Sequence, residues 1–136
     1  MSAAAANRAA EKTVINRVLV VDDNRDNMLT LGVLLRSEGY IVDLANDGAE
    51  ALRLAAAFRP DVALLDLLLP DRSGFDVAEE LQRRFATDCP VLIAITAHNT
   101  SHTKEQAEIS GFHHFVAKPY DPQALLQLIE SLDETT

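Results

Sequence analysis

The sequence predicts a single α/β domain of three layers, (βα)5, in which a doubly wound, parallel five-stranded sheet carries helices on both faces. Short apolar runs rich in Val, Ile and Leu recur along the chain, as is typical of strands that are buried on both faces. Segments with helical spacing of their apolar residues separate these runs. The length of 136 residues suits one domain, and 48% apolar residues suffice for its core.

The regular alternation begins at Arg17, which sets the expected domain boundary. Residues 1–16 are rich in alanine, carry no motif, and are expected to form an N-terminal extension outside the core. Residues 17–136 are expected to form the domain itself, and no repeat or low-complexity linker interrupts them.

The first strand is expected over residues 18–21, a run of four apolar side chains. Asn24 is a suitable N-cap for the helix that follows, and Gly39 ends that helix. A second, partly alternating strand covers residues 40–44, and the next helix opens at Asp47-Gly48.

Pro60 stops this second helix, and residues 61–66 form the third strand. A loop that contains Pro70 leads to a third helix, whose apolar positions run from residue 75 to residue 85. The fourth strand follows at residues 91–95.

A polar helix covers roughly residues 100–110, and a short fifth strand is expected over residues 113–116. Asp121 caps the last helix. In a parallel sheet of this kind, ligands bind beyond the carboxyl ends of the strands. The residues at those ends are therefore the first candidates for a functional site.

The net charge of −9 at pH 7 argues against direct binding to nucleic acids or to an anionic membrane surface, because phosphates would repel the domain. No apolar stretch approaches the roughly 20 residues that a spanning helix needs, and no signal peptide is apparent. Cys89 is the single cysteine, so an intrachain disulfide is excluded, and its thiol is expected to pack in the structure. A cytoplasmic location is expected.

Polar side chains stand where the predicted strands end. Asp22 and Asp23 follow the first strand, Asp66 ends the third, and Thr96 ends the fourth. Lys118 follows the fifth. Because the carboxyl ends of parallel strands share one edge of the sheet, these five residues are expected to converge.

Such a set of side chains suits phosphoryl transfer. Three carboxylates repel one another unless a cation lies between them, and Mg²⁺ is the natural partner of clustered carboxylate oxygens. The metal and a lysine can neutralise the oxygens of the transferred group, while a carboxylate attacks phosphorus in line.

Four short motifs occur in a fixed order at these strand ends. They are Val20-Val21-Asp22-Asp23-Asn24, Asp66-Leu67-Leu68-Leu69-Pro70 with Gly74, Ile95-Thr96-Ala97, and Lys118-Pro119. With this order and spacing, the chain resembles the receiver domain of response regulators in two-component systems, over about residues 17–133. The resemblance implies the flavodoxin-like strand order 2-1-3-4-5.

The resemblance also implies a role for each matching residue. Asp66 corresponds to the phosphoacceptor. Asp23 and Asp66 would bind Mg²⁺ directly, together with the backbone carbonyl of Leu68. Asp22 would act mainly through metal-bound water, and Lys118 would pair first with the acidic cluster and then with the phosphoryl group.

Two further positions are implied to respond to phosphorylation. Thr96 would hydrogen-bond a phosphoryl oxygen, and Phe115 matches the aromatic switch position three residues before the lysine. Pro119 would follow a cis peptide bond that aims Lys118.

Leu68 and His98 match the rim positions that tune dephosphorylation in this family. Leu68 is apolar and cannot orient an attacking water molecule, so we expect the phosphoryl group on Asp66 to be long-lived. Leu69 and Tyr120 depart from the common family pattern, and neither is expected to touch the phosphorylation chemistry.

The resemblance implies a switch that catalyses only its own phosphorylation and dephosphorylation. Its phosphodonor would be a histidine kinase or a histidine phosphotransfer protein, and its strand 4 and strand 5 face would change for partner binding. Two alternatives stay open. One is a Mg²⁺-dependent phosphatase with an aspartyl nucleophile, and the other is a receiver used only as an interaction module.

These motifs do not indicate which downstream target or fused domain the receiver would control. The 136 residues contain no helix-turn-helix, basic region or nucleotide-binding loop, so the downstream target or fused domain is unknown. Met1 favours a free-standing regulator, whereas the C-terminal third resembles receivers attached to hybrid sensor kinases, which favours a domain excised from a larger protein. The sequence is also compatible with a homodimer.

Overall fold

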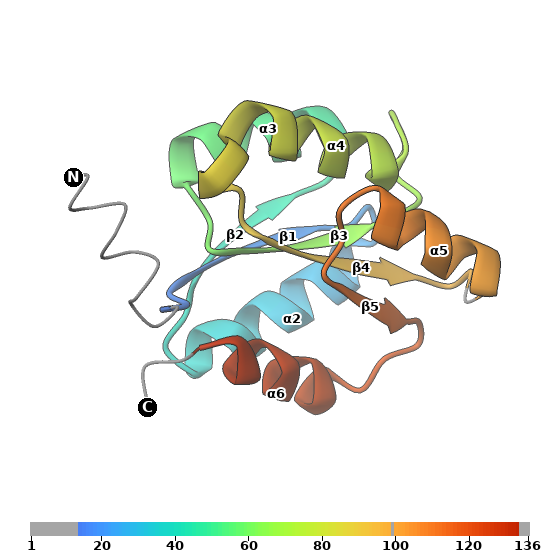
Figure 1. The fold of residues 1–136 in the computed structure, drawn as a ribbon. Coiled ribbons are helices and arrows are strands. Elements are labelled where there is room, and N and C mark those ends of the chain that lie inside the picture. The colour runs from blue at the N-terminus through green and yellow to red at the C-terminus, as the bar shows by residue number, and fades with distance from the viewer. Residues whose placement is uncertain (1–13, 99, 134–136) are drawn as a thin grey trace.

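The computed structural model describes residues 14–98 and 100–133, which form one parallel sheet between layers of helices (Figure 1). The strands lie in the order β2-β1-β3-β4-β5, and every neighbouring pair is parallel. This confirms the predicted fold class and strand order. The strands are β1 (Arg17–Val21), β2 (Ile41–Ala45), β3 (Val62–Asp66), β4 (Val91–Thr96) and β5 (His114–Ala117).

Helices cover both faces of the sheet, as a doubly wound fold requires. In Figure 1, α2 and α6 lie on one side of the sheet, and α3 and α4 lie on the other. No helix within the described ranges is both long and apolar enough to cross a membrane. The helices are α2 (Arg25–Ser37), α3 (Gly48–Phe58), α4 (Gly74–Phe85), α5 (Ser101–Ile109) and α6 (Pro122–Leu132), with a 3-10 turn η1 (Ala86–Asp88).

Short polar side chains begin the five helices. Asn24, Asp47 and Asp121 are the N-caps of α2, α3 and α6, as the sequence predicted, and each accepts a hydrogen bond from a backbone N–H of the first turn. Ser73 and Thr100 do the same for α4 and α5. At the other end of α2, Gly39 has a φ of +96°, the left-handed conformation that terminates a helix.

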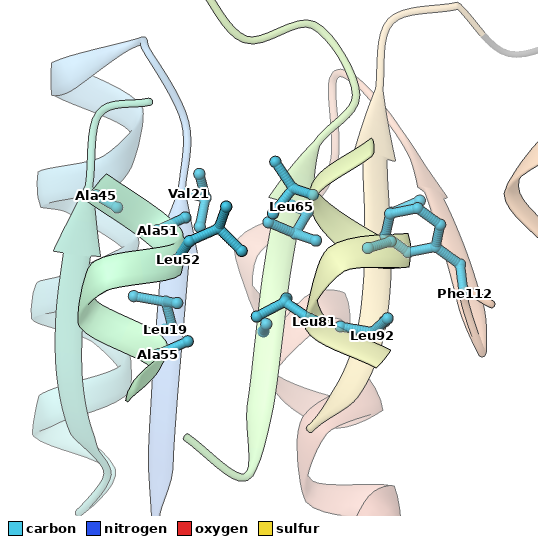
Figure 2. Close-up of a cluster of buried hydrophobic side chains, with 14 of the residues drawn as sticks. Leu19, Val21, Ala45, Ala51, Leu52, Ala55, Leu65, Leu81, Leu92 and Phe112 are labelled. Carbon is cyan, nitrogen blue, oxygen red and sulfur yellow. The ribbon is translucent and has the colours of Figure 1, made fainter. Parts of the chain in front are cut away.

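Two hydrophobic clusters hold the layers together. On β3, Leu65 belongs to the cluster under α3 and α4, whereas Leu64 belongs to the cluster under α2 and α6. Both are fully buried. Figure 2 shows the first cluster, in which Leu81 of α4 and Phe112 approach the same face of the sheet. A strand with both faces buried explains the unbroken apolar runs in the sequence.

Three strands begin one residue later than the sequence predicted, and β3, which starts at Val62, is one of them. β2 starts at Ile41, because the backbone N–H of Tyr40 still bonds the carbonyl of Leu35 at the end of α2. β5 starts at His114, although His113 is already bonded to β4 through its own N–H. The carboxyl ends of β1 and β3 lie where the sequence predicted, and β2, β4 and β5 extend one residue further.

The packed part of the domain begins before Arg17. Ile15 is only 3% exposed and belongs to the cluster under α2 and α6, although the sequence placed it in the N-terminal extension. The backbone N–H groups of Asn16 and Arg17 both donate to Asp61, each at 2.9 Å. Residues 1–13 of the expected extension lie outside the described residues.

Candidate functional site

Three carboxylates meet at the carboxyl ends of the two strands in the middle of the sheet. Asp22 and Asp23 follow β1, and Asp66 ends β3, which pairs with β1. One carboxylate oxygen from each lies within 4.8 Å of those of the other two. Asp22 and Asp66 are 5% and 6% exposed, whereas Asp23 faces solvent. The pocket is therefore acidic, mostly buried, and open on one side.

Backbone groups hold the two buried carboxylates in place. Asp22 accepts a hydrogen bond from the N–H of Asn24 at 2.9 Å, and its own N–H donates to the carbonyl of Ala45 at 3.1 Å. The first oxygen of Asp66, Oδ1, accepts from the N–H of Leu68 at 2.9 Å. Each carboxylate thus has one oxygen bound by its own loop, and the second oxygen points to another partner.

That partner is Lys118. Its Nζ donates to Oδ2 of Asp66 at 2.7 Å and to Oδ2 of Asp22 at 3.1 Å. Burial works to lower the pKa of Lys118, but the hydrogen bonds and charges of the two aspartates outweigh it and leave the pKa raised. The Lys118–Pro119 peptide is cis, and the N–H of Lys118 bonds the carbonyl of Thr96 at 2.8 Å.

Thr96 and Phe115 lie on the two strands next to the acidic pocket. Thr96 ends β4, is 1% exposed, and its hydroxyl oxygen accepts from the N–H of His98 at 3.0 Å. Phe115 lies on β5, pairs in register with Ala94, and is partly buried against the cluster under α3 and α4. Both side chains therefore connect the edge of the pocket to the core.

The loop after Asp66 folds tightly because of Gly74. A Cβ at Gly74 would lie 2.5 Å from the carbonyl oxygen of Asp66 and 2.8 Å from Cα of Leu67, closer than side chains can approach backbone. The N–H of Gly74 donates to the carbonyl of Leu67 at 2.9 Å, and Leu68 forms an isolated bridge with Ser73. The absence of a side chain at Gly74 lets α4 start against the end of β3.

Leu68 and His98 stand at the rim of the site. Leu68 is 59% exposed and His98 is also exposed. Both line one hollow, whose walls come from the β3–α4 loop and from the segment after β4. Its lining includes Leu67, Leu68, Leu69, Phe75, Thr96 and His98.

The donor set of the acidic pocket fits Mg²⁺. Asp22, Asp23 and Asp66 supply hard carboxylate oxygens close enough to share one small cation. Leu68 lies on the same loop as Asp66, two residues further along the chain. Lys118 leaves the remaining charge negative, so the pocket still attracts a divalent ion. Within the described residues, this is the one group of three acidic, histidine or cysteine side chains close enough to bind a metal.

Two residues near the site were missed by the sequence prediction. Tyr120 lines a hollow together with Lys118; burial raises the pKa of Tyr120, and the nearby charge of Asp22 adds to this effect. Asp71 accepts hydrogen bonds from the backbone of Gly48 and Ala49 at the start of α3. The Pro-Asp pair in the acceptor loop was the available signal for Asp71, because such pairs mark ordered turns.

Known proteins with similar sequences and structures are response regulators. The family model described as the response regulator receiver domain matches residues 18–130. Response regulator MprA of Mycobacterium leprae is 36% identical over 116 residues, which cover 85% of this chain and 50% of that protein. Transcriptional regulatory protein PdtaR of Mycobacterium tuberculosis is 34% identical over 123 residues, which cover 89% of this chain and 58% of that protein.

Among solved structures, the chemotaxis response regulator CheY4 of Vibrio cholerae superimposes with a TM-score of 0.80 at 26% identity. The similarity covers 88% of this chain and 99% of that one. By contrast, the chain spans about half the length of the curated relatives it matches. The family match, the relatives and the shared fold agree: this chain belongs to the response regulator receiver domain family of two-component signalling systems.

Proposed function

We propose that Asp66 accepts a phosphoryl group from a histidine kinase or a histidine phosphotransfer protein, with Mg²⁺ as the cofactor. One observation carries this proposal: the buried Asp66 carboxylate lies 2.7 Å from Nζ of Lys118 and shares its pocket with two further carboxylates. This arrangement supports the proposal, because an attacking oxygen, a fixed cation and a set of metal ligands would share one small site.

In the proposed step, a carboxylate oxygen of Asp66 forms a bond to phosphorus as the bond from phosphorus to the donor histidine breaks. The donor imidazole leaves and regains its proton. Asp23, Asp66 and the Leu68 carbonyl would hold Mg²⁺, with Asp22 acting mainly through water, and the metal would supply positive charge to the phosphoryl oxygens. Lys118 shifts from Asp66 towards the transferred group.

The product carries roughly −1.5 to −2 charges on the phosphoryl group. Lys118 and the hydroxyl of Thr96 then bind its oxygens. Movement of Thr96 makes room behind it, and Phe115 turns inward to fill that room. The face formed by β4 and β5 changes as a shift between two populations of one fold, and partners bind this face differently in each state.

Incubation of the chain with Mg²⁺ and acetyl phosphate tests the acceptor. Mass spectrometry should show the gain of one phosphoryl group in the wild type and in Asp76→Asn, an exposed aspartate on α4 that serves as the control. Asp66→Asn should gain none, and removal of Mg²⁺ should abolish the gain. An Asp66→Asn variant that is still labelled would overturn the proposal.

An aspartyl phosphatase is not favoured, because the family match and the similar proteins are response regulators. The same incubation distinguishes the two functions, since a phosphatase would release phosphate from small phosphoesters over many turnovers.

Receivers of this family work with histidine kinases and effector domains. This chain corresponds to about half of its relatives' length. We propose a cytoplasmic location, where a kinase would meet the pocket.

A further inference from the structure

Asp71 binds the start of a helix that belongs to another part of the chain. Its Oδ1 accepts from the N–H of Gly48 at 2.8 Å, and its Oδ2 accepts from the N–H of Ala49 at 2.9 Å. The helix α3 already has its own N-cap, Asp47, which binds the N–H of Glu50 at 2.8 Å. Asp71 is therefore an additional ligand of α3 and ties the β3–α4 loop to it.

A second contact joins the same two segments. A Cβ at Gly48 would lie 2.6 Å from the side-chain carbons of Arg72, so the stem of Arg72 packs flat on the glycine. Nε of Arg72 also donates to Oδ2 of Asp71 at 3.3 Å. Two neighbouring side chains of the loop thus rest on the first turn of α3.

The turn between β2 and α3 also contacts the other loop of the acidic pocket. The carbonyl of Ala45, the last residue of β2, accepts from the N–H of Asp22 at 3.1 Å. Three residues further along the chain, Gly48 binds Asp71. The β2–α3 turn therefore joins the loop that carries Asp22 and Asp23 to the loop that carries Leu68.

We propose that Asp71 is a positioning residue of the metal site, which fixes the loop bearing the Leu68 carbonyl relative to the carboxylates after β1. This inference rests on the proposed function. One cation must take ligands from both loops, and binding is tighter when ligands are held in place beforehand. The hydrogen bond from Gly48 holds the pKa of Asp71 below its usual value, so the carboxylate is ionised and able to accept at neutral pH.

A Mg²⁺ titration of the full ¹⁵N-labelled chain, followed by NMR shifts of the pocket amides, measures the effect. Asp71→Ala should raise the Kd for Mg²⁺ by about tenfold, the lower end of the effect of residues that orient metal ligands. Asp71→Asn keeps one acceptor oxygen and should raise the Kd for Mg²⁺ by a smaller factor. In Asp71→Ala, saturating Mg²⁺ should restore the wild-type rate of labelling by acetyl phosphate.

Asp47→Ala is the matched control, because it removes a cap from the same helix without touching the β3–α4 loop. It should destabilise α3 in urea unfolding yet keep the wild-type Kd for Mg²⁺. An unchanged Kd in Asp71→Ala, or an equal rise in Asp47→Ala, would overturn the inference alone. A wild type that shows no Mg²⁺-dependent shifts, or an Asp66→Asn variant that binds Mg²⁺ as tightly, would overturn the proposed function as well.

Discussion

At the scale of single residues, Leu68 and His98 are the two rim positions that we expect to influence how water reaches Asp66. Leu68 is 59% exposed and lines one hollow together with His98. It offers no hydrogen-bonding group. The polarity of this one side chain should therefore influence the lifetime of the phosphorylated state.

We predict that Leu68→Asn shortens that lifetime severalfold, because an amide can orient water towards phosphorus. Loss of the phosphoryl mass after removal of the phosphodonor measures the rate. Ile109→Asn, a similar change at a 77% exposed position on α5, should decay as the wild type does. Equal decay in Leu68→Asn and wild type would contradict the prediction, and His98→Glu offers a second test.

Gly74 is a residue whose lack of a side chain the fold requires. We predict that Gly74→Ala destabilises the domain by about 1–3 kcal/mol, because the added Cβ meets backbone that cannot move aside. Urea unfolding measures the change. Gly32→Ala is the contrasting control: its Cβ meets Leu44 at an ordinary 3.5 Å inside α2, so it should stabilise by about 0.5–1 kcal/mol. A stable Gly74→Ala variant would show that the loop after Asp66 adapts.

The convergence of the pocket residues could be predicted because strand ends of a parallel sheet share one edge. The family resemblance also implied that Lys118 pairs with the acidic cluster, but it did not say which carboxylates Lys118 contacts. That Lys118 reaches both Asp22 and Asp66 depends on side-chain rotamers and on the path after β5, which no local pattern encodes. Asp71 was missed for a similar reason, since its partners at Gly48 and Ala49 are 23 and 22 positions away.

At the scale of elements, β4 and β5 are joined at their start by a side chain as well as by backbone. The N–H of His113 donates to the carbonyl of Leu92 at 2.8 Å, and Nδ1 of His113 accepts from the N–H of Leu92 at 3.0 Å. Burial, with a contribution from His114, lowers the pKa of His113 below its usual value. A protonated Nδ1 carries its own hydrogen and cannot accept the Leu92 bond.

We predict that acidification weakens this junction. The unfolded chain, with an ordinary histidine pKa of about 6.5, binds a proton more readily than folded His113, so stability is present above that pH. This stability is lost as the pH falls through the lowered pKa of His113 in the folded chain. Urea unfolding from about pH 7 to pH 5 should therefore show a steeper loss in wild type than in His113→Gln. His102→Gln, exposed on α5, should keep the wild-type slope.

The boundaries of the elements show what sequence patterns resolve. Apolar runs located all five strands, yet β2, β3 and β5 start one residue later than predicted. In β2 the reason is that Tyr40 is still bonded to the end of α2, a hydrogen bond that hydropathy does not distinguish. The 3-10 turn at Ala86–Asp88 was not predicted. Ala86 has a φ of +47°, a conformation that its residue type gives no reason to expect.

At the scale of the whole molecule, the sheet separates two clusters that share no buried residue. Leu81 belongs to the cluster drawn in Figure 2, and Ile129 to the one beneath α2 and α6. Both are fully buried. The order of the strands followed from the family resemblance, whereas the assignment of each side chain to a face required the structure.

We predict that Leu81→Ala costs about 2–5 kcal/mol and Ile129→Val about 0.5–1.5 kcal/mol, because each leaves a cavity. The double variant should lose the sum to within about 0.5 kcal/mol, since the two sites have no common neighbours. Urea unfolding of the wild type, the two single variants and the double variant gives these changes in the free energy of unfolding. Coupling well beyond that margin would mean that the sheet transmits packing changes between its faces.

Lys118 binds both Asp22 and Asp66, and this pairing determines the net charge of the acidic pocket. Three carboxylates and one ammonium leave two negative charges, which a divalent cation cancels. Phosphorylation turns the Asp66 carboxylate into a neutral ester-like group while adding a phosphoryl dianion, so the occupied pocket departs from neutrality by about one charge. If Asp66 is phosphorylated as proposed, the net charge of the occupied pocket changes by only about one unit, although the phosphoryl group itself carries about two. We therefore expect a partner protein to distinguish the two states mainly by the shape of the surface.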